Sequence, residues 1–498
     1  MDTTIPMPTF PHPIYSRHVL QPAYADAQAF LFTPMLAAHE AHTVMLAECN
    51  IISQENAAAI LHAVAQIKAA DADAFAYQPG IEDLFFRIEG AIIDTAGADY
   101  GGNLQLARSR NDLGQALARM ALREGILAVA GDLLALRQVV LRRAEGFVNT
   151  LMPGYTHTQP AQPVTFAHYL AGVLTFLGKD QARLTAAYAN VNESPLGAAA
   201  FTGTGFPIDR QRLAELLGFD SVIPSTHHSI GAGDHLTDVA FAVQSLAIGL
   251  SRMTKDLLFL ATQEAGALHI DDSFIQISSI MPQKRNPVVL EHLRARASRA
   301  LGAAQTIAIQ CHNIPYGDTQ DIEDEILPPL QEALTTLQEC LTLYTAVFET
   351  LQLHETHLRQ RAGAGFTTAT ELADTLVREA RLPFRQAHKI VAHMVQSAVQ
   401  AGVGADGLTL DRLQTAAQAI LRQPLNFSAE QLERALDPQL FVKVRVDVGG
   451  VSPQATTLLL GQLQSALRVD QEWVAAAQTR LQSADALRRE AIEMLLAP

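Results

Sequence analysis

Apolar side chains recur every three or four positions over long, proline-free stretches of this chain. Between residues 112 and 145, for example, Leu113, Leu117, Met120 and Ile126 keep this spacing. The spacing predicts an amphipathic helix, because positions three and four apart lie on one helix face. The same pattern predicts further long helices over 164–193, 234–266, 288–313 and 321–357, the last of which is kinked or delayed by Pro328-Pro329.

Helices of this length favour a bundle. A helix of about 30 residues is about 45 Å long, and such rods pack side by side with their apolar stripes facing each other. We therefore predict an all-α fold of three domains: a mainly helical N-terminal domain over 1–108, a central long-helix bundle over 109–357, and a small helical C-terminal domain over 358–498. The apolar faces exceed what one rod-shaped monomer can cover, which favours their burial in an oligomer.

Composition narrows the expected partners and location. The 498 residues include 36 Lys+Arg and 51 Asp+Glu, for a net charge of −15. A net anion attracts neither nucleic acid nor an anionic membrane, so we expect neither as a partner. The three cysteines cannot form a disulfide framework, and residues 1–13 lack the basic and apolar parts of a signal peptide. These features predict a cytoplasmic protein.

Adjacent acidic and histidine pairs raise the question of a metal site. His227-His228 and Asp271-Asp272 are such pairs, but neither belongs to a helical set with ligands four residues apart. We interpret them as plain loop residues, and we expect neither a metal nor an organic cofactor.

The segment 277–287, which reads ISSIMPQKRNP, is the stretch with the clearest chemical content. It is a polar loop between two apolar helices, and loops held between rigid helices often carry reactive groups. Its two prolines restrict the backbone on either side of Lys284. Taken alone, however, Ser-Ser and Asn-Pro are ordinary turn chemistry.

The loop is one of three motifs that point to the same family. The pattern Ser-x-x-Met-Pro-x-Lys-x-Asn from Ser278, followed by Glu291, resembles the signature of the fumarase/aspartase superfamily, and most of all that of the argininosuccinate lyase family. Residues 108–112 (RSRND) and 152–159 (MPGYTHTQ) agree with it. Weaker similarity extends over 195–197, 205–210, 373–391, 436–438 and 449–453. The resemblance covers nearly the whole chain, and three separated motifs in the right order argue against coincidence.

This resemblance implies a carbon–nitrogen lyase that reversibly releases fumarate and an amine from an N-substituted aspartate. It also implies a homotetramer whose sites draw the three motifs from different subunits. Such an elimination needs a base that removes a weakly acidic proton next to a carboxylate. It also needs positive charge or hydrogen-bond donors for the resulting aci-carboxylate, and an acid for the departing nitrogen.

The resemblance assigns the catalytic groups by position. Ser278 matches the family's base, and its hydroxyl needs nearby cations or N–H groups in order to ionise. Lys284 and Asn286 match the groups that stabilise the aci-carboxylate. His157 matches a histidine that pairs with a glutamate, here Glu291.

A second group of residues matches substrate-binding positions. Ser109, Arg110 and Asn111 open a predicted helix and match the binders of the fumarate carboxylates, where unpaired N–H groups favour anions. Thr156 matches a substrate contact, and Gln159 a supporting residue. Considered alone, an arginine such as Arg110 is usually solvated, and a histidine such as His157 is usually packed in the interior. Taken together, and in the order of the family's motifs, these residues favour functional roles.

Several positions depart from the family pattern. Gln105-Leu106-Ala107 replaces His-Thr-Gly, and the run 229–235 (SIGAGDH) replaces a more acidic run. The other departures are Ile277 for a glycine, Val288 for an aspartate, and Asp318 for a tyrosine, with Tyr316 slightly upstream. The positions for the fumarate half are intact. Our hypothesis is therefore unchanged chemistry with an altered amine pocket, in which Asp318 supplies a carboxylate and argininosuccinate is one candidate substrate.

Two alternatives stay open on the sequence. One is a catalytically inactive, crystallin-like structural or binding member of the family, which the intact Ser278, Lys284, Asn286 and His157 weigh against. The other is a hydratase or a lyase of another superfamily branch, against which the run Thr156-His157-Thr158-Gln159 favours the argininosuccinate branch.

Overall fold

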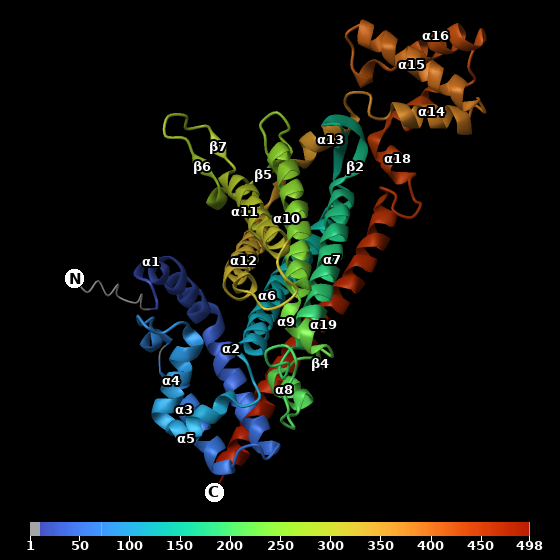
Figure 1. Ribbon diagram of the computed structural model, residues 1–498. Coiled ribbons are helices and arrows are strands. Elements are labelled where there is room, and N and C mark those ends of the chain that lie inside the picture. Colours follow the sequence, from blue (N-terminus) through green and yellow to red (C-terminus); the bar gives the residue numbers. More distant parts are fainter. Residues whose placement is uncertain (1–9, 71, 498) are drawn as a thin grey trace.

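A computed structural model describes residues 10–70 and 72–497, and a bundle of long helices dominates it (Figure 1). The all-α prediction is confirmed, and each of the five predicted rods is present. They are α6 (Arg110–Gly146), α7 (Phe166–Val191), α10 (Asp234–Leu260), α11 (Val288–Cys311) and α12 (Leu327–Thr350). The predicted rod 321–357 differs at its start, because a π-helical turn, η5 (Asp321–Glu325), precedes Pro328-Pro329 and α12 begins only at Leu327.

A sixth long helix completes the bundle. Helix α19 (Pro453–Leu496) has 44 residues and packs along α6 and α7 before it reaches the N-terminal helices. It begins at Ser452, whose hydroxyl accepts the N–H of Ala455 at 3.1 Å, and Pro453 fits the first helical turn because no N–H partner is needed there. Residues such as Leu467 and Val474 join α19 to the main hydrophobic core.

Two smaller units flank the bundle. At one end, α2 (Gln21–Glu48), α3 (Gln54–Ala69) and α4 (Leu84–Ala96) share a core with the first turns of α6 and with α8 (Arg210–Leu217). Beyond the other end, a separate core joins α14 (Ala369–Arg378), α15 (Phe384–Gln400), α16 (Leu410–Leu421) and α17 (Ala429–Leu436). The division at 108 and 358 stays a prediction.

The remaining helices are short connectors. They are α1 (Pro13–Tyr15), α5 (Ala98–Gly101), α9 (Thr226–Gly231), α13 (Glu355–Gly363) and α18 (Pro438–Lys443), with the π-helical η1 (Ser16–Leu20) and the 3₁₀ turns η2 (Ala72–Phe75), η3 (Gly102–Gln105), η4 (Asp272–Phe274) and η6 (Ala405–Gly407). Among the described residues, no helix is both long enough and apolar enough to cross a membrane.

The strands form four two-stranded ribbons in the described part of the chain. The longest is the antiparallel hairpin of β1 (Leu151–Thr156) and β2 (Gln159–Thr165), and the base of the 277–287 loop is closed by β6 (Gln276–Ile277) and β7 (Arg285–Asn286). The others pair β3 (Glu193–Ser194) with β4 (Ser221–Val222) and β5 (Leu268–His269) with β8 (Gln352–Leu353). Figure 1 shows both antiparallel hairpins at the end of the bundle away from the N-terminal helices.

A buried ion pair ties α19 to α6. Nη1 of Arg137 lies 2.6 Å from Oδ2 of Asp470, and the Arg137 side chain is only 2% exposed. Replacing Asp470 by alanine leaves a buried guanidinium without its partner. We expect Asp470→Ala to destabilise the protein by about 3–5 kcal/mol, measured as a lower melting temperature.

The matched control is the exposed pair Arg142–Glu349, 3.5 Å apart, in which both side chains are more than half exposed. We expect Glu349→Ala to change stability by less than about 0.5 kcal/mol. Equal effects of the two substitutions would mean that the Arg137–Asp470 pair does not hold α19 in place.

Candidate active site

The first motif lies at the start of α6. Ser109 is the N-cap of this helix, and its hydroxyl donates to Oδ1 of Asn111 at 2.7 Å while accepting the N–H of Asn111 at 3.3 Å. The N–H of Ser109 donates to Oδ1 of Asp112 at 2.9 Å, which completes a capping box. The structure thus places Ser109 and Asn111 together at a helix N-terminus, where an anion is favoured.

Arg110 is held by acidic neighbours from the N-terminal unit. Its Nη1 lies 2.7 Å from Oδ2 of Asp83 and 3.4 Å from Oε1 of Glu82, and its guanidinium stacks over the ring of Phe86 at 4.7 Å. A guanidinium has five N–H donors in a planar fork. Two carboxylates on one nitrogen therefore leave donors for a substrate carboxylate.

Buried charges beneath this helix start fix its position. Asp112 is fully buried, and its Oδ2 accepts the N–H groups of Gly197 at 2.9 Å and Ala199 at 3.0 Å. Burial raises the pKa of Asp112 to about 6, although the N–H donors and nearby Arg108 act in the opposite direction. Burial also lowers the pKa of Arg108 to about 10. The carboxylate of Asp112 thus joins the first motif to the segment 195–200.

The departure at 105–107 is part of the same buried support. The guanidinium of Arg108 donates twice to Oε1 of Gln105, at 3.1 and 3.0 Å. Nε2 of His42 lies 2.9 Å from the carbonyl oxygen of Leu106. Burial, followed by the charge of Arg108, lowers the pKa of His42 well below its usual range, so this histidine is neutral.

The second motif lies on the tip of the β1–β2 hairpin. His157 and Thr158 form its two-residue turn, between the paired Thr156 and Gln159, and both have positive φ, at 52° and 62°. Such a turn normally holds Asn or Gly, and a β-branched threonine there costs about 1–3 kcal/mol. Thr156, His157 and Gln159 are all exposed at this tip. The strained turn presents the histidine outward.

The third motif places its serine beside two backbone N–H donors. The Ser278 hydroxyl oxygen accepts the N–H of Met281 at 3.1 Å and that of Ile280 at 3.4 Å. Hydrogen bonds to an oxygen favour its ionised form. The help that the sequence analysis required for a serine base is therefore present within the loop itself.

The loop is anchored by a residue that the sequence analysis left out. Arg285 forms an ion pair with Asp272, and Nε2 of His269 lies 3.4 Å from Oδ1 of the same carboxylate. Asp271 accepts the N–H of Ser273 at 3.0 Å as the cap of a 3₁₀ turn. Asp271 and Asp272 thus stand at the start of the short turn η4, and Asp272 holds the base of the 277–287 loop.

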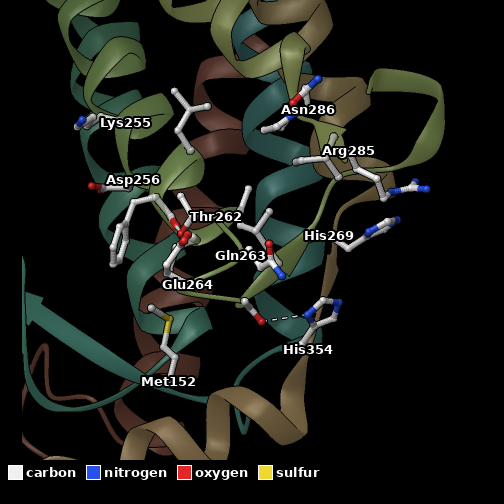
Figure 2. A pocket seen from close by; sticks show the side chains of 18 of the residues that line it. Met152, Lys255, Asp256, Thr262, Gln263, Glu264, His269, Arg285, Asn286 and His354 are labelled. Atoms are coloured by element: carbon white, nitrogen blue, oxygen red, sulfur yellow. Dashed lines mark hydrogen bonds between the residues drawn. The ribbon is translucent and has the colours of Figure 1, made fainter. Parts of the chain in front are cut away.

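A cavity of about 1500 Å³ lies between the second and third motifs. Lys284, Asn286 and Glu291 line it from the loop and from α11, and Thr158 lines it from the hairpin. Figure 2 shows Asn286, Arg285, His269 and His354 on one side of this cavity, with Lys255 and Asp256 opposite. Lys255, His269 and His354 were not predicted, because each is isolated in sequence and only the fold brings it to the cavity.

The structure does not bring the first motif to this cavity. Helix α6 has 37 residues, so its start at Arg110 lies about 55 Å from its end, which leads into the β1–β2 hairpin. Within one chain, Ser109, Arg110 and Asn111 therefore lie far from Thr156, His157 and Gln159.

Comparison with known proteins identifies the family. A family model described as Lyase matches residues 23–302, and one described as Argininosuccinate lyase C-terminal matches 366–443. The argininosuccinate lyase of Methanosarcina acetivorans is 34% identical over 462 residues, which is 92% of each chain. The argininosuccinate lyase of Halobacterium salinarum is 38% identical over 448 residues, or 90% of each chain.

The chain belongs to the argininosuccinate lyase family. Among solved structures, a variant of EDDS lyase with bound fumarate matches with a TM-score of 0.87 and 32% identity, covering 97% of this chain and 96% of that one. The 3-carboxy-cis,cis-muconate lactonizing enzyme of Pseudomonas putida shares the fold, with a TM-score of 0.72 at 20% identity over 92% of this chain and all of that one.

In this member of the argininosuccinate lyase family, the buried side chain of Asp112 should make the free energy of unfolding depend on pH. Its folded pKa of about 6 lies above the usual unfolded value of about 4, so the native state binds an extra proton between these pH values. The free energy of unfolding should therefore fall by up to about 3 kcal/mol as pH rises through this window. Asp112→Asn, which cannot ionise, should lack this contribution.

The measurement is the melting temperature of both proteins at pH 5 and pH 7. We expect wild type to gain stability relative to Asp112→Asn at the lower pH. A relative loss on acidification would mean that the three N–H donors outweigh burial and keep the carboxylate ionised.

Proposed function

We propose that this protein cleaves the carbon–nitrogen bond of an N-substituted aspartate to give fumarate and an amine. The reaction class is that of the family to which the chain belongs. The observation that carries the proposal is the loop 277–287, in which the Ser278 oxygen receives two backbone N–H groups while Lys284 and Asn286 line the adjoining cavity. Base and charge-stabilising groups thus come from one short segment.

In the proposed mechanism, ionised Ser278 removes the proton from the carbon next to a substrate carboxylate. The electrons move into that carboxylate, which becomes a doubly charged aci-carboxylate and needs the ammonium of Lys284 and the amide of Asn286. Return of the electrons forms the double bond of fumarate and breaks the bond to nitrogen. His157, paired with Glu291, is the proposed proton donor to the leaving amine.

The remaining carboxylate contacts come from the first motif. Ser109 and Asn111 stand at the N-terminus of α6, and Arg110 adds a guanidinium. Thr156 contacts the substrate, and Gln159 supports the hairpin tip. Because α6 separates the first and second motifs by about 55 Å, we propose that each site combines motifs from different copies, in the homotetramer expected for the family.

The amine pocket is the part of the proposed site that differs from the family pattern. In the EDDS lyase variant, an aspartate and a tyrosine that lie thirty residues apart are replaced. Val288 and Asp318 are also thirty residues apart, and they stand where the family pattern has an aspartate and a tyrosine. Val288 begins α11 and Asp318 follows its end, so this 24-residue helix, about 36 Å long, lies between them within one chain. Both positions can therefore border one pocket only when they come from different copies.

The first test is a panel of N-substituted aspartates, with fumarate followed by its ultraviolet absorbance, and the reverse addition of amines to fumarate. We expect Ser278→Ala to lower turnover about 10²–10⁴-fold, because proton transfer typically contributes that much. The neighbouring Ser279→Ala is the matched control and should stay within a few-fold of wild type. Turnover of Ser278→Ala within about tenfold of wild type would rule out this base.

The second test asks whether sites are shared between copies. Asn111→Ala and Ser278→Ala should each be inactive alone, because every site lacks one motif. After dissociation and reassembly of an equal mixture, about a quarter of the sites should hold both intact motifs if these come from different copies. No recovery in mixtures that have exchanged subunits, shown by mass spectrometry, would mean that one copy supplies both motifs.

A further inference from the structure

Three aromatic rings from separate segments form an exposed wall beside the first motif. The rings of Phe201 and His227 meet edge-on at 5.7 Å, and those of His227 and Tyr316 lie 5.2 Å apart. Phe201 is 49% exposed and Tyr316 58% exposed in the chain. We call Phe201, His227 and Tyr316 the aromatic wall.

The aromatic wall is held rigidly by hydrogen bonds. Nε2 of His227 lies 3.0 Å from the carbonyl oxygen of Tyr316, and Nδ1 of His228 lies 2.6 Å from the Tyr316 hydroxyl. Nε2 of His228 is in turn 3.6 Å from Oδ2 of Asp234. These contacts correct the interpretation of His227-His228 as plain loop residues, since both lie in α9 and position Tyr316. Such preorganisation lowers the entropic cost of binding.

A close backbone approach fixes the same tyrosine. A Cβ added at Gly231 would come within 2.9 Å of the Tyr316 carbonyl carbon and the Gly317 nitrogen. No side chain fits there, since Cβ atoms essentially never come so close to backbone. Gly231 belongs to the run 229–235 that departs from the family pattern, and Tyr316 stands beside the departure at Asp318. Two departures that are distant in sequence therefore meet at one place.

This place adjoins the proposed binding site for the fumarate half. Nδ2 of Asn111 lies 3.5 Å from the carbonyl oxygen of Ala200, the residue before Phe201. The segment that carries Tyr316 continues to Asp324, whose pKa is raised to about 6, mainly by burial and then by Asp83, while Arg110 opposes the shift. The two segments thus flank the first motif.

The charge near the aromatic wall suits a cation. The sequence from 318 to 325, which follows Tyr316, is acidic and has no basic residue, and Asp234 lies beside His228. A dianionic fumarate half gains nothing from these carboxylates. A cation gains both from them and from aromatic faces within about 6 Å of it.

We infer that Tyr316, with Phe201 and His227, forms the subsite that binds a second, positively charged group on the amine half of the substrate. Tyr316 is then a specificity-determining residue, and the departures at 229–235 and 316–318 together make its pocket. This inference rests on the proposed function, because it concerns the amine released with fumarate.

The test uses the reverse reaction, in which fumarate is combined with diaminobutane, with pentylamine of similar length but no second charge, or with methylamine. Wild type should prefer diaminobutane to pentylamine. Tyr316→Ala should reduce that preference about tenfold or more, without changing the KM for fumarate or the rate with methylamine. Tyr316→Phe keeps the ring and should retain most of the preference.

Two matched pairs separate recognition from general damage. Phe201→Ala should act like Tyr316→Ala, whereas Phe206→Ala, on the same segment and 45% exposed, should not. Gly231→Ala should displace Tyr316 and reduce the preference, whereas Gly233→Ala should not, because its Cβ would meet only Cys311 at an ordinary 3.5 Å.

The outcomes distinguish this inference from the proposed function. Failure of wild type to add any amine to fumarate would contradict the function itself. Addition of methylamine without a preference for diaminobutane would overturn only the cationic subsite. An equal loss with all three amines in Tyr316→Ala would give Tyr316 a purely structural role, and would likewise overturn it.

Discussion

The length of α6 is the constraint on which the rest of the site depends. Its 37 residues set the first motif at one end of the bundle and deliver the chain to the β1–β2 hairpin about 55 Å away. The buried leucines that make this rod stable also prevent it from bending its two ends together. A dicarboxylate site that combined residues from both ends would have to be completed by other copies, which is the physical reason for the proposed sharing of sites.

The exposed groups of the three motifs are held by different kinds of support, of which that of the first motif is buried. Asn111 and Ser109 rest on the buried carboxylate of Asp112, which also binds Gly197 and Ala199. Arg285 ties the catalytic loop to Asp272. The hairpin tip has a different support, since a positive φ at His157 and Thr158 persists only where the flanking strands impose it. The supports of Ser109 and Arg285 are hydrogen bonds and ion pairs, which fix orientation in a way that apolar packing does not.

Periodicity predicted the five rods well, because each presents a continuous apolar stripe and lacks internal proline. It did not place α19 in the bundle, since which rods touch depends on connections that the pattern does not contain. The motifs identified the candidate residues of the site. Pairs that meet only in space, such as Arg285–Asp272 and Tyr316–His228, have no local sequence signature. The β1–β2 turn was missed for a related reason. His and Thr are poor residues for positive φ, so local propensity argues against the conformation that the fold imposes.

The location of the departures explains how specificity can change while chemistry is kept. The residues proposed for the fumarate half lie on a helix cap and a hydrogen-bonded loop, where a substitution would disturb the geometry of several donors at once. Gly231 lies instead at the end of α9 and Tyr316 on the segment after α11, and these two places meet each other beside the first motif. The two departures are coupled, because the backbone at Tyr316 and Gly317 can occupy its position only where residue 231 has no side chain. Such a pair changes the amine pocket as a unit and leaves the capping box of α6 intact.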